Sequence, residues 1–236
     1  MALQANYNPV TLKDLAKVLI SSAVLIFVTQ LVLIQINFLE FTKQFAHQSI
    51  VTSLVYLLQS VEMLAPLYWF VVRKHKLSFA DFGFTKVPVK KIITSVLESF
   101  GIVMIFNFVL MYFILELGFE SPGFGMQKEH ISLFGTATID IVLAVVVVAL
   151  LAPVIEELFF RGFLLKTLIK YMHPAIASLI AAAVFGLIHL EFSSAGILIF
   201  LGLILNRLYI KTGSLLPGIA FHLLNNILAF WLEFQR

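Results

Sequence analysis

Residues 151–161 read LAPVIEELFFR, so two adjacent carboxylates, Glu156 and Glu157, stand inside one of the most apolar stretches of the chain. An ionised side chain near the centre of a bilayer costs roughly 3 kcal/mol on insertion scales. A sequence carries that cost when the residues are paired, when they line a wet cavity, or both. The pair therefore indicates a functional site within a membrane-embedded helix.

The composition of the chain is that of a helical membrane protein. Of its 236 residues, 61% are hydrophobic and 12% are charged, whereas a soluble domain is about 45–50% apolar and about 25% charged. Apolar runs of about 20 residues predict an all-α, polytopic transmembrane bundle of about seven spans (six to eight) with an intramembrane polar cavity. The absence of cysteine excludes disulfides and thiol catalysis. The expected spans are 15–38, 49–72, 92–116, 138–158 continuing toward 172, 174–190, 195–210 and 216–233.

The basic residues predict the organisation and the orientation. We expect residues 1–137 to form the N-terminal transmembrane helices with a basic loop at 73–91, and residues 138–236 to form the core helices that carry the glutamate pair, within a single membrane domain. Six of the 16 Lys and Arg residues lie in that loop, and short basic loops stay in the cytoplasm. Two spans precede the loop, so the N-terminus is expected in the cytoplasm too. This excess of positive charge sets topology and does not indicate a nucleic-acid partner.

The spacing around Glu156 predicts which residues carry chemistry. Glu157 and Arg161 are four residues apart on a helix, so they share a face and can pair, whereas Glu156 points elsewhere. A reversal of the chain at residues 173–174 brings His189 to nearly the same depth as Glu156. The spacing thus makes a Glu156–His189 pair plausible, and a carboxylate in an apolar cavity is suited to act as a general base or acid.

The last span offers hydrogen-bond donors. His222 and Asn226 are four residues apart and project from one face, as donors aimed at a developing oxyanion would. Phe185 lies one turn before His189 and can pack against its ring. Taken one at a time, the motifs have structural alternatives: an interfacial ion pair, a core histidine, and hydrogen bonds that join helices. Glu62, in the middle of the second span, is either a buried structural group or a residue that lines the cavity, and the structural interpretation is favoured.

Taken together, the motifs resemble the CPBP family (CAAX proteases and bacteriocin-processing enzymes). These are glutamate intramembrane proteases that include the type II CAAX prenyl endopeptidases. The chain carries Glu-Glu-x-x-x-Arg at 156–161, Phe-x-x-x-His at 185–189 and His-x-x-x-Asn at 222–226, in the family's order. The resemblance covers roughly residues 138–230. It implies an endopeptidase in which water is activated by Glu156 and His189, the oxyanion is stabilised by His222 and Asn226, and Glu156 is oriented by Glu157 and Arg161.

The resemblance also implies the setting and the partners. The substrate would be a peptide or a membrane-associated protein, and the setting would be the lipid bilayer of a bacterial cytoplasmic membrane, with the active site facing the cytoplasm. No cofactor is expected. A metal held by Glu156, His189 and His222 is not favoured, because the compact ligand spacing of zinc helices is missing.

Two other classes of protein compete with the protease. The main alternative is a non-catalytic CPBP-like protein that acts in bacteriocin self-immunity or as a scaffold or regulator of membrane proteins. A transporter would show internal pseudo-symmetry or two broken helices in matching positions, and the sequence shows neither. The signatures of zinc, rhomboid-type serine and presenilin-like aspartyl intramembrane proteases are absent from the sequence.

Overall fold

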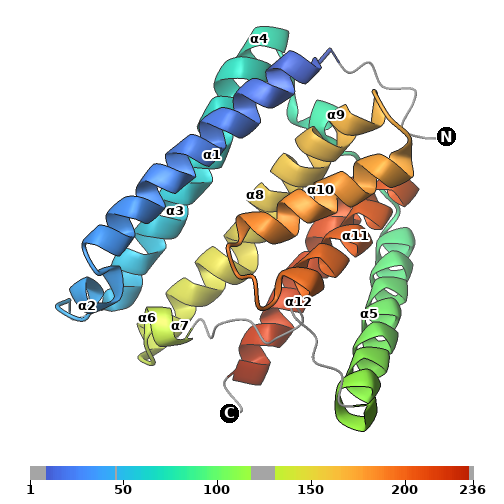
Figure 1. Ribbon diagram of the computed structural model, residues 1–236. Coiled ribbons are helices and arrows are strands. Elements are labelled where there is room, and N and C mark those ends of the chain that lie inside the picture. The colour runs from blue at the N-terminus through green and yellow to red at the C-terminus, as the bar shows by residue number, and fades with distance from the viewer. Residues whose placement is uncertain (1–8, 46, 118–130, 234–236) are drawn as a thin grey trace. The chain divides into compact units, whose positions relative to one another are not determined.

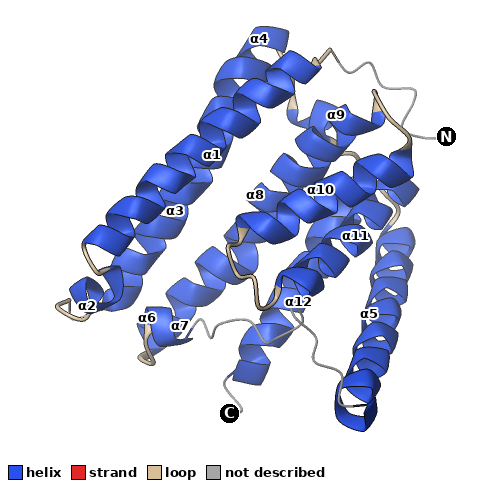
Figure 2. Ribbon diagram, in the orientation of Figure 1, coloured by secondary structure: helices blue, strands red, loops and turns tan. Residues whose placement is uncertain are grey.

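The computed structural model describes residues 9–45, 47–117 and 131–233, which form helices joined by loops, with no strand among them (Figure 2). The all-α membrane fold expected from the sequence is confirmed, because each expected span corresponds to an apolar helix. Two of these helices, Pro174–Ile188 and Leu216–Leu232, are shorter than the rest. The segments long and apolar enough to cross a membrane are Leu12–Gln35, Gln48–His75, Val89–Phe113, Thr138–Ile169 and Ala195–Thr212.

The chain packs as two compact units that alternate along the sequence. Of the described residues, 79–117 and 160–222 belong to unit 1. Residues 9–45, 47–78, 131–159 and 223–233 belong to unit 2. Two helices run from one unit into the other, and they are the ones that carry the Glu156 and His222 motifs.

In unit 2, two antiparallel helices lie side by side: α1 (Leu12–Gln35) and the segment made of α3 (Gln48–Leu67), η1 (Tyr68–Val72) and α4 (Arg73–His75) (Figure 1). A short helix, α2 (Phe38–Thr42), lies between them in the sequence. Near the middle of the pair, the hydroxyl of Thr29 donates a hydrogen bond to the buried carboxylate of Glu62. This contact joins α1 to α3 and supports the structural interpretation of Glu62.

The helix that carries Glu156 is continuous from Thr138 to Ile169, a length of 32 residues. After the short α6 (Ile131–Phe134), it comprises α7 (Thr138–Ala144), η3 (Val145–Leu151), α8 (Ala152–Glu156), η4 (Glu157–Leu165) and α9 (Lys166–Ile169). At 1.5 Å per residue it spans about 48 Å, which exceeds the roughly 30 Å of a bilayer core. A break near Pro153 or Gly162 would accommodate the extra length, but the helix continues through both residues. Instead, η3 and η4 are π-helical, and such adjustments let a membrane helix continue past proline.

In unit 1, α10 (Pro174–Ile188) and α11 (Ala195–Thr212) pack closely along their length (Figure 1). A Cβ added at Gly186 would come within 2.5 Å of Ile199 Cγ1, and one added at Gly202 would come within 3.1 Å of Ala182. Small residues at such interfaces let two membrane helices approach closely. The two glycines therefore allow the close approach of α10 and α11.

The loop expected at 73–91 is shorter than predicted, because α4 extends to His75, η2 (Phe79–Phe82) forms a 3₁₀ turn, and α5 (Val89–Leu117) begins at Val89. The part of the loop that follows η2 contacts the turn that precedes α12 (Leu216–Glu233). Ser214 Oγ donates to the carbonyl of Thr85 at 2.8 Å, and the Leu215 N–H donates to that of Gly83 at 2.8 Å. The loop thus fixes the start of the helix that carries His222.

Candidate active site

Phe185 is the common contact of the predicted site residues in unit 1. Its ring is 1% exposed. It meets the ring of His189 edge-on at a centroid distance of 4.9 Å and that of His222 at 6.0 Å. The expected packing of Phe185 against His189 is therefore observed, and His222 packs on the same ring. Two histidines that are 33 positions apart in the sequence are thereby gathered around one buried aromatic side chain.

His189 caps α10 and has its ring held by the backbone. Its Nδ1 lies 2.7 Å from the carbonyl oxygen of Phe185. A carbonyl only accepts, so Nδ1 carries the proton in this contact, and in a neutral ring the lone pair then resides on Nε2. The half-buried imidazole is thus held by its own helix, with Nε2 as its acceptor nitrogen.

Arg161 is fully buried and makes its hydrogen bonds to α11. Its Nε donates to Asn206 Oδ1 at 3.0 Å and its Nη2 donates to the carbonyl of Gly202 at 3.1 Å. The guanidinium also lies over the Phe185 ring, 4.5 Å from its centroid. Arg161 therefore ties η4 to both α10 and α11, and its expected pairing with Glu157 stays a prediction.

Asn206 is a site residue that the sequence reasoning missed. It is fully buried, accepts from Arg161, and donates from Nδ2 to the carbonyl of Ser178 on α10 at 2.8 Å. The available signal was an amide in the middle of an apolar span, which usually marks a hydrogen bond between membrane helices. Asn206 completes a buried network that joins three helices behind Phe185.

The two glutamates differ in burial. Glu156 ends α8 and is half-buried, whereas Glu157 begins η4 and is fully buried. Both fall in unit 2, while Arg161, His189 and His222 fall in unit 1. The pairing of Glu156 with His189 through a water molecule, and the polar cavity that it requires, stay predictions. π-helical segments occur often at functional sites, and η4 begins at Glu157, the second glutamate of the pair.

Asn226 has a structural contact that the sequence did not predict. Its Nδ2 donates to the carbonyl of Val148 at 3.2 Å, within unit 2. At the end of η3 the Ala152 N–H bonds to the carbonyl of Val147, five residues back. The next donor in that register would come from position 153, where proline has no N–H. Asn226 therefore satisfies a carbonyl that Pro153 leaves without its helical donor.

We expect Asn226→Ala to cost about 1–3 kcal/mol of stability, because it leaves a buried carbonyl unsatisfied. In a Pro153→Ala background the cost should shrink, since the restored backbone N–H can bond to Val148. Thermal unfolding of both single variants and the double variant in detergent measures this coupling. Asn225→Ala, on the neighbouring face of the helix, is the control. Equal losses for Asn226→Ala in both backgrounds would refute the assignment.

Comparison with known proteins gives the family. Residues 138–228 match the family model described as type II CAAX prenyl endopeptidase Rce1-like. The match confirms the resemblance of this region to the CPBP/CAAX protease family. The match and the apolar helices together indicate an integral membrane protein with an intramembrane protease role. Neither the search of curated proteins nor the search of solved structures found a match for the chain.

Proposed function

We propose that the protein is a glutamate intramembrane endopeptidase that hydrolyses a peptide bond with an activated water molecule. The observation that carries the proposal is the packing of His189 and His222 on one Phe185 ring. This arrangement lies inside the region that matches the protease family, and the same region contains both glutamates. A purely structural pair of histidines would not require a Glu-Glu-x-x-x-Arg motif in another apolar helix of the same region.

In the proposed first step, Glu156 and His189 share a water molecule. The contact of Nδ1 with Phe185 leaves Nε2 of His189 as the hydrogen-bond acceptor for that water. The Glu156 carboxylate accepts its other hydrogen and takes the proton as the water oxygen attacks the peptide carbonyl carbon. The carbonyl π-bond breaks, and its electron pair moves to the oxygen, which becomes an oxyanion.

His222 and Asn226 are proposed to stabilise this oxyanion by donating hydrogen bonds. An Asn amide has two N–H donors. The bond to Val148 engages one of them and fixes the plane of the amide, so the second has a set direction before the substrate arrives. Donors that are oriented in advance need no reorganisation as charge develops.

The tetrahedral intermediate then collapses. The C–N bond breaks, the carbonyl re-forms, and the leaving nitrogen takes the proton held by Glu156. The products are a carboxylic acid and an amine, so the reaction consumes one water and needs no redox partner. We propose that the site opens toward the cytoplasm, because the basic loop docks on the turn just before α12.

The direct test is hydrolysis by the purified chain in detergent. We expect it to cleave at least one member of a peptide panel that contains prenylated C-terminal tails and unmodified leader-like peptides. In ¹⁸O-water the new carboxylate should gain one ¹⁸O atom, and added hydroxylamine should give no hydroxamate, because no acyl-enzyme forms. Inhibition by chelators would instead favour the metal alternative. A chain without turnover that still confers its cellular phenotype would support the non-catalytic alternative.

A further inference from the structure

One end of the α1–α3 helix pair carries five exposed cations. Lys13 and Lys17 lie in the first turns of α1, and Arg73, Lys74 and Lys76 lie at the end of α4 or just after it. We call these five residues the basic collar. Asp14 is the only acidic residue among residues 9–35 and 63–78, so the collar keeps a strong positive charge.

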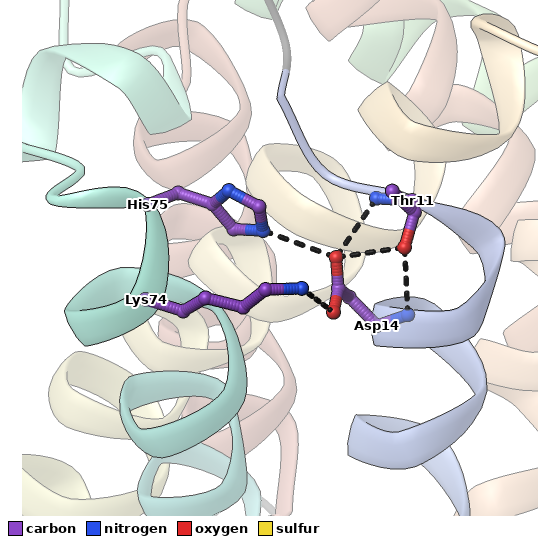
Figure 3. Close-up of polar contacts among 4 residues, drawn as sticks. All are labelled: Thr11, Asp14, Lys74 and His75. Atoms are coloured by element: carbon purple, nitrogen blue, oxygen red, sulfur yellow. Dashed lines mark hydrogen bonds and ion pairs between the residues drawn. The ribbon is translucent and has the colours of Figure 1, made fainter.

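Asp14 binds the two helix ends to each other. Its carboxylate is 2% exposed and accepts from Lys74 Nζ at 2.7 Å and from His75 Nε2 at 3.0 Å (Figure 3). The hydroxyl and backbone N–H of Thr11 donate to the same carboxylate at 2.8 Å and 3.1 Å. Because this buried carboxylate already binds Thr11, Lys74 and His75, it does not neutralise the other four cations of the collar. It holds the collar residues of two helices in one place.

Aromatic side chains lie at the same level as the collar. The Lys17 ammonium is 5.6 Å from the centroid of Phe70, and the Arg73 guanidinium is 4.5 Å from that of Trp69. Tyr68 and Trp69 are more than half exposed, on a helix long and apolar enough to cross a membrane. Exposed Trp and Tyr beside basic residues mark the level of lipid headgroups. Further along α1, exposed apolar residues such as Ile20 and Val24 can meet acyl chains.

We propose that the basic collar is a binding site for the headgroup of an anionic phospholipid. The phosphate would be held by Lys13 and Lys17 from α1 and by Arg73 and Lys76 from the end of α4. Clusters of four to eight basic residues next to a membrane span are a known basis for such recognition. Such a site is more specific than a general attraction of positive charge to the membrane. The collar forms one site from two helices whose ends are joined by Asp14.

Native mass spectrometry of the full chain in detergent, titrated with phosphatidylglycerol or phosphatidylcholine, tests this site. We expect one saturable phosphatidylglycerol adduct and no comparable adduct with phosphatidylcholine. The collar variant Lys13→Gln/Lys17→Gln/Lys76→Gln should bind phosphatidylglycerol at least about tenfold more weakly. The matched control, Lys86→Gln/Lys90→Gln/Lys91→Gln, removes the same number of charges from unit 1 and should bind as the unaltered chain does. Equal losses in both variants would overturn the proposal.

The variant Asp14→Asn distinguishes a specific lipid-binding site from a general attraction between opposite charges. The substitution makes the chain more positive, so a simple attraction between charges predicts tighter phosphatidylglycerol binding. The proposed site predicts weaker binding, by at least about threefold, because Lys74 and His75 lose the carboxylate that holds the two helix ends together. Folding of every variant is checked by its unfolding temperature without added lipid. Unchanged or tighter binding in a folded Asp14→Asn protein would overturn the assignment of Asp14.

Discussion

Glu156→Gln is expected to reduce peptide hydrolysis by at least about a thousandfold, because the amide cannot take the proton of the attacking water. The side chain keeps its size, and Glu156 is only half-buried, so the fold should be retained. His189→Ala should cause a loss of similar size, since it removes the Nε2 acceptor. The measurement is the rate of product formation by the purified variants on whichever peptide the unaltered chain cleaves.

Glu62→Gln is the matched control for Glu156→Gln. Glu62 is also a carboxylate inside a membrane-spanning helix, and it accepts a hydrogen bond from Thr29 on α1. Its replacement makes the same change of charge and shape at a position that has no part in the proposed reaction. Hydrolysis should therefore stay near the original rate. Full activity of either Glu156→Gln or His189→Ala would rule out the proposed water activation.

Asn206→Leu is expected to destabilise the protein by about 3–5 kcal/mol, because it removes an acceptor from the buried Arg161 guanidinium. It also leaves the carbonyl of Ser178 without its donor. For a chain of this size the loss corresponds to a fall of about 10 °C in the unfolding temperature. Thermal unfolding in detergent, followed by tryptophan fluorescence, gives the value directly.

Two further variants separate this network from a general effect of charge. In the double variant Arg161→Met/Asn206→Leu, the buried cation and its partner are removed together. Its loss of stability should therefore be smaller than the sum of the losses in the two single variants. Arg207 follows Asn206 in the sequence but is largely exposed, 3.5 Å from Glu98. Arg207→Met should cost less than about 1 kcal/mol. A similar loss in Arg207→Met and Asn206→Leu would show that the buried network does not stabilise the fold.

Much of the fold was predictable because membrane helices are encoded locally. A run of apolar residues of sufficient length predicts a span without any knowledge of its neighbours. The observed helix ends differ from the expected ones by a few residues. The loop predicted at 73–91 was too long, because α4 continues to His75 before the chain turns. The π-helical segments were not predicted, since they depend on how the freed backbone groups around Pro153 find donors on another helix.

The sequence by itself determined the class of membrane protein, the order of the helices and the three motifs of the candidate site. It could do so because four-residue spacing reports which side chains share a face within one helix. Tertiary structure alone decided that Arg161 bonds to Asn206, that Asn226 bonds to Val148, and that His222 packs on the ring of Phe185. These contacts join residues from different helices. Their existence depends on how the helices pack against one another, which spacing along the chain does not specify.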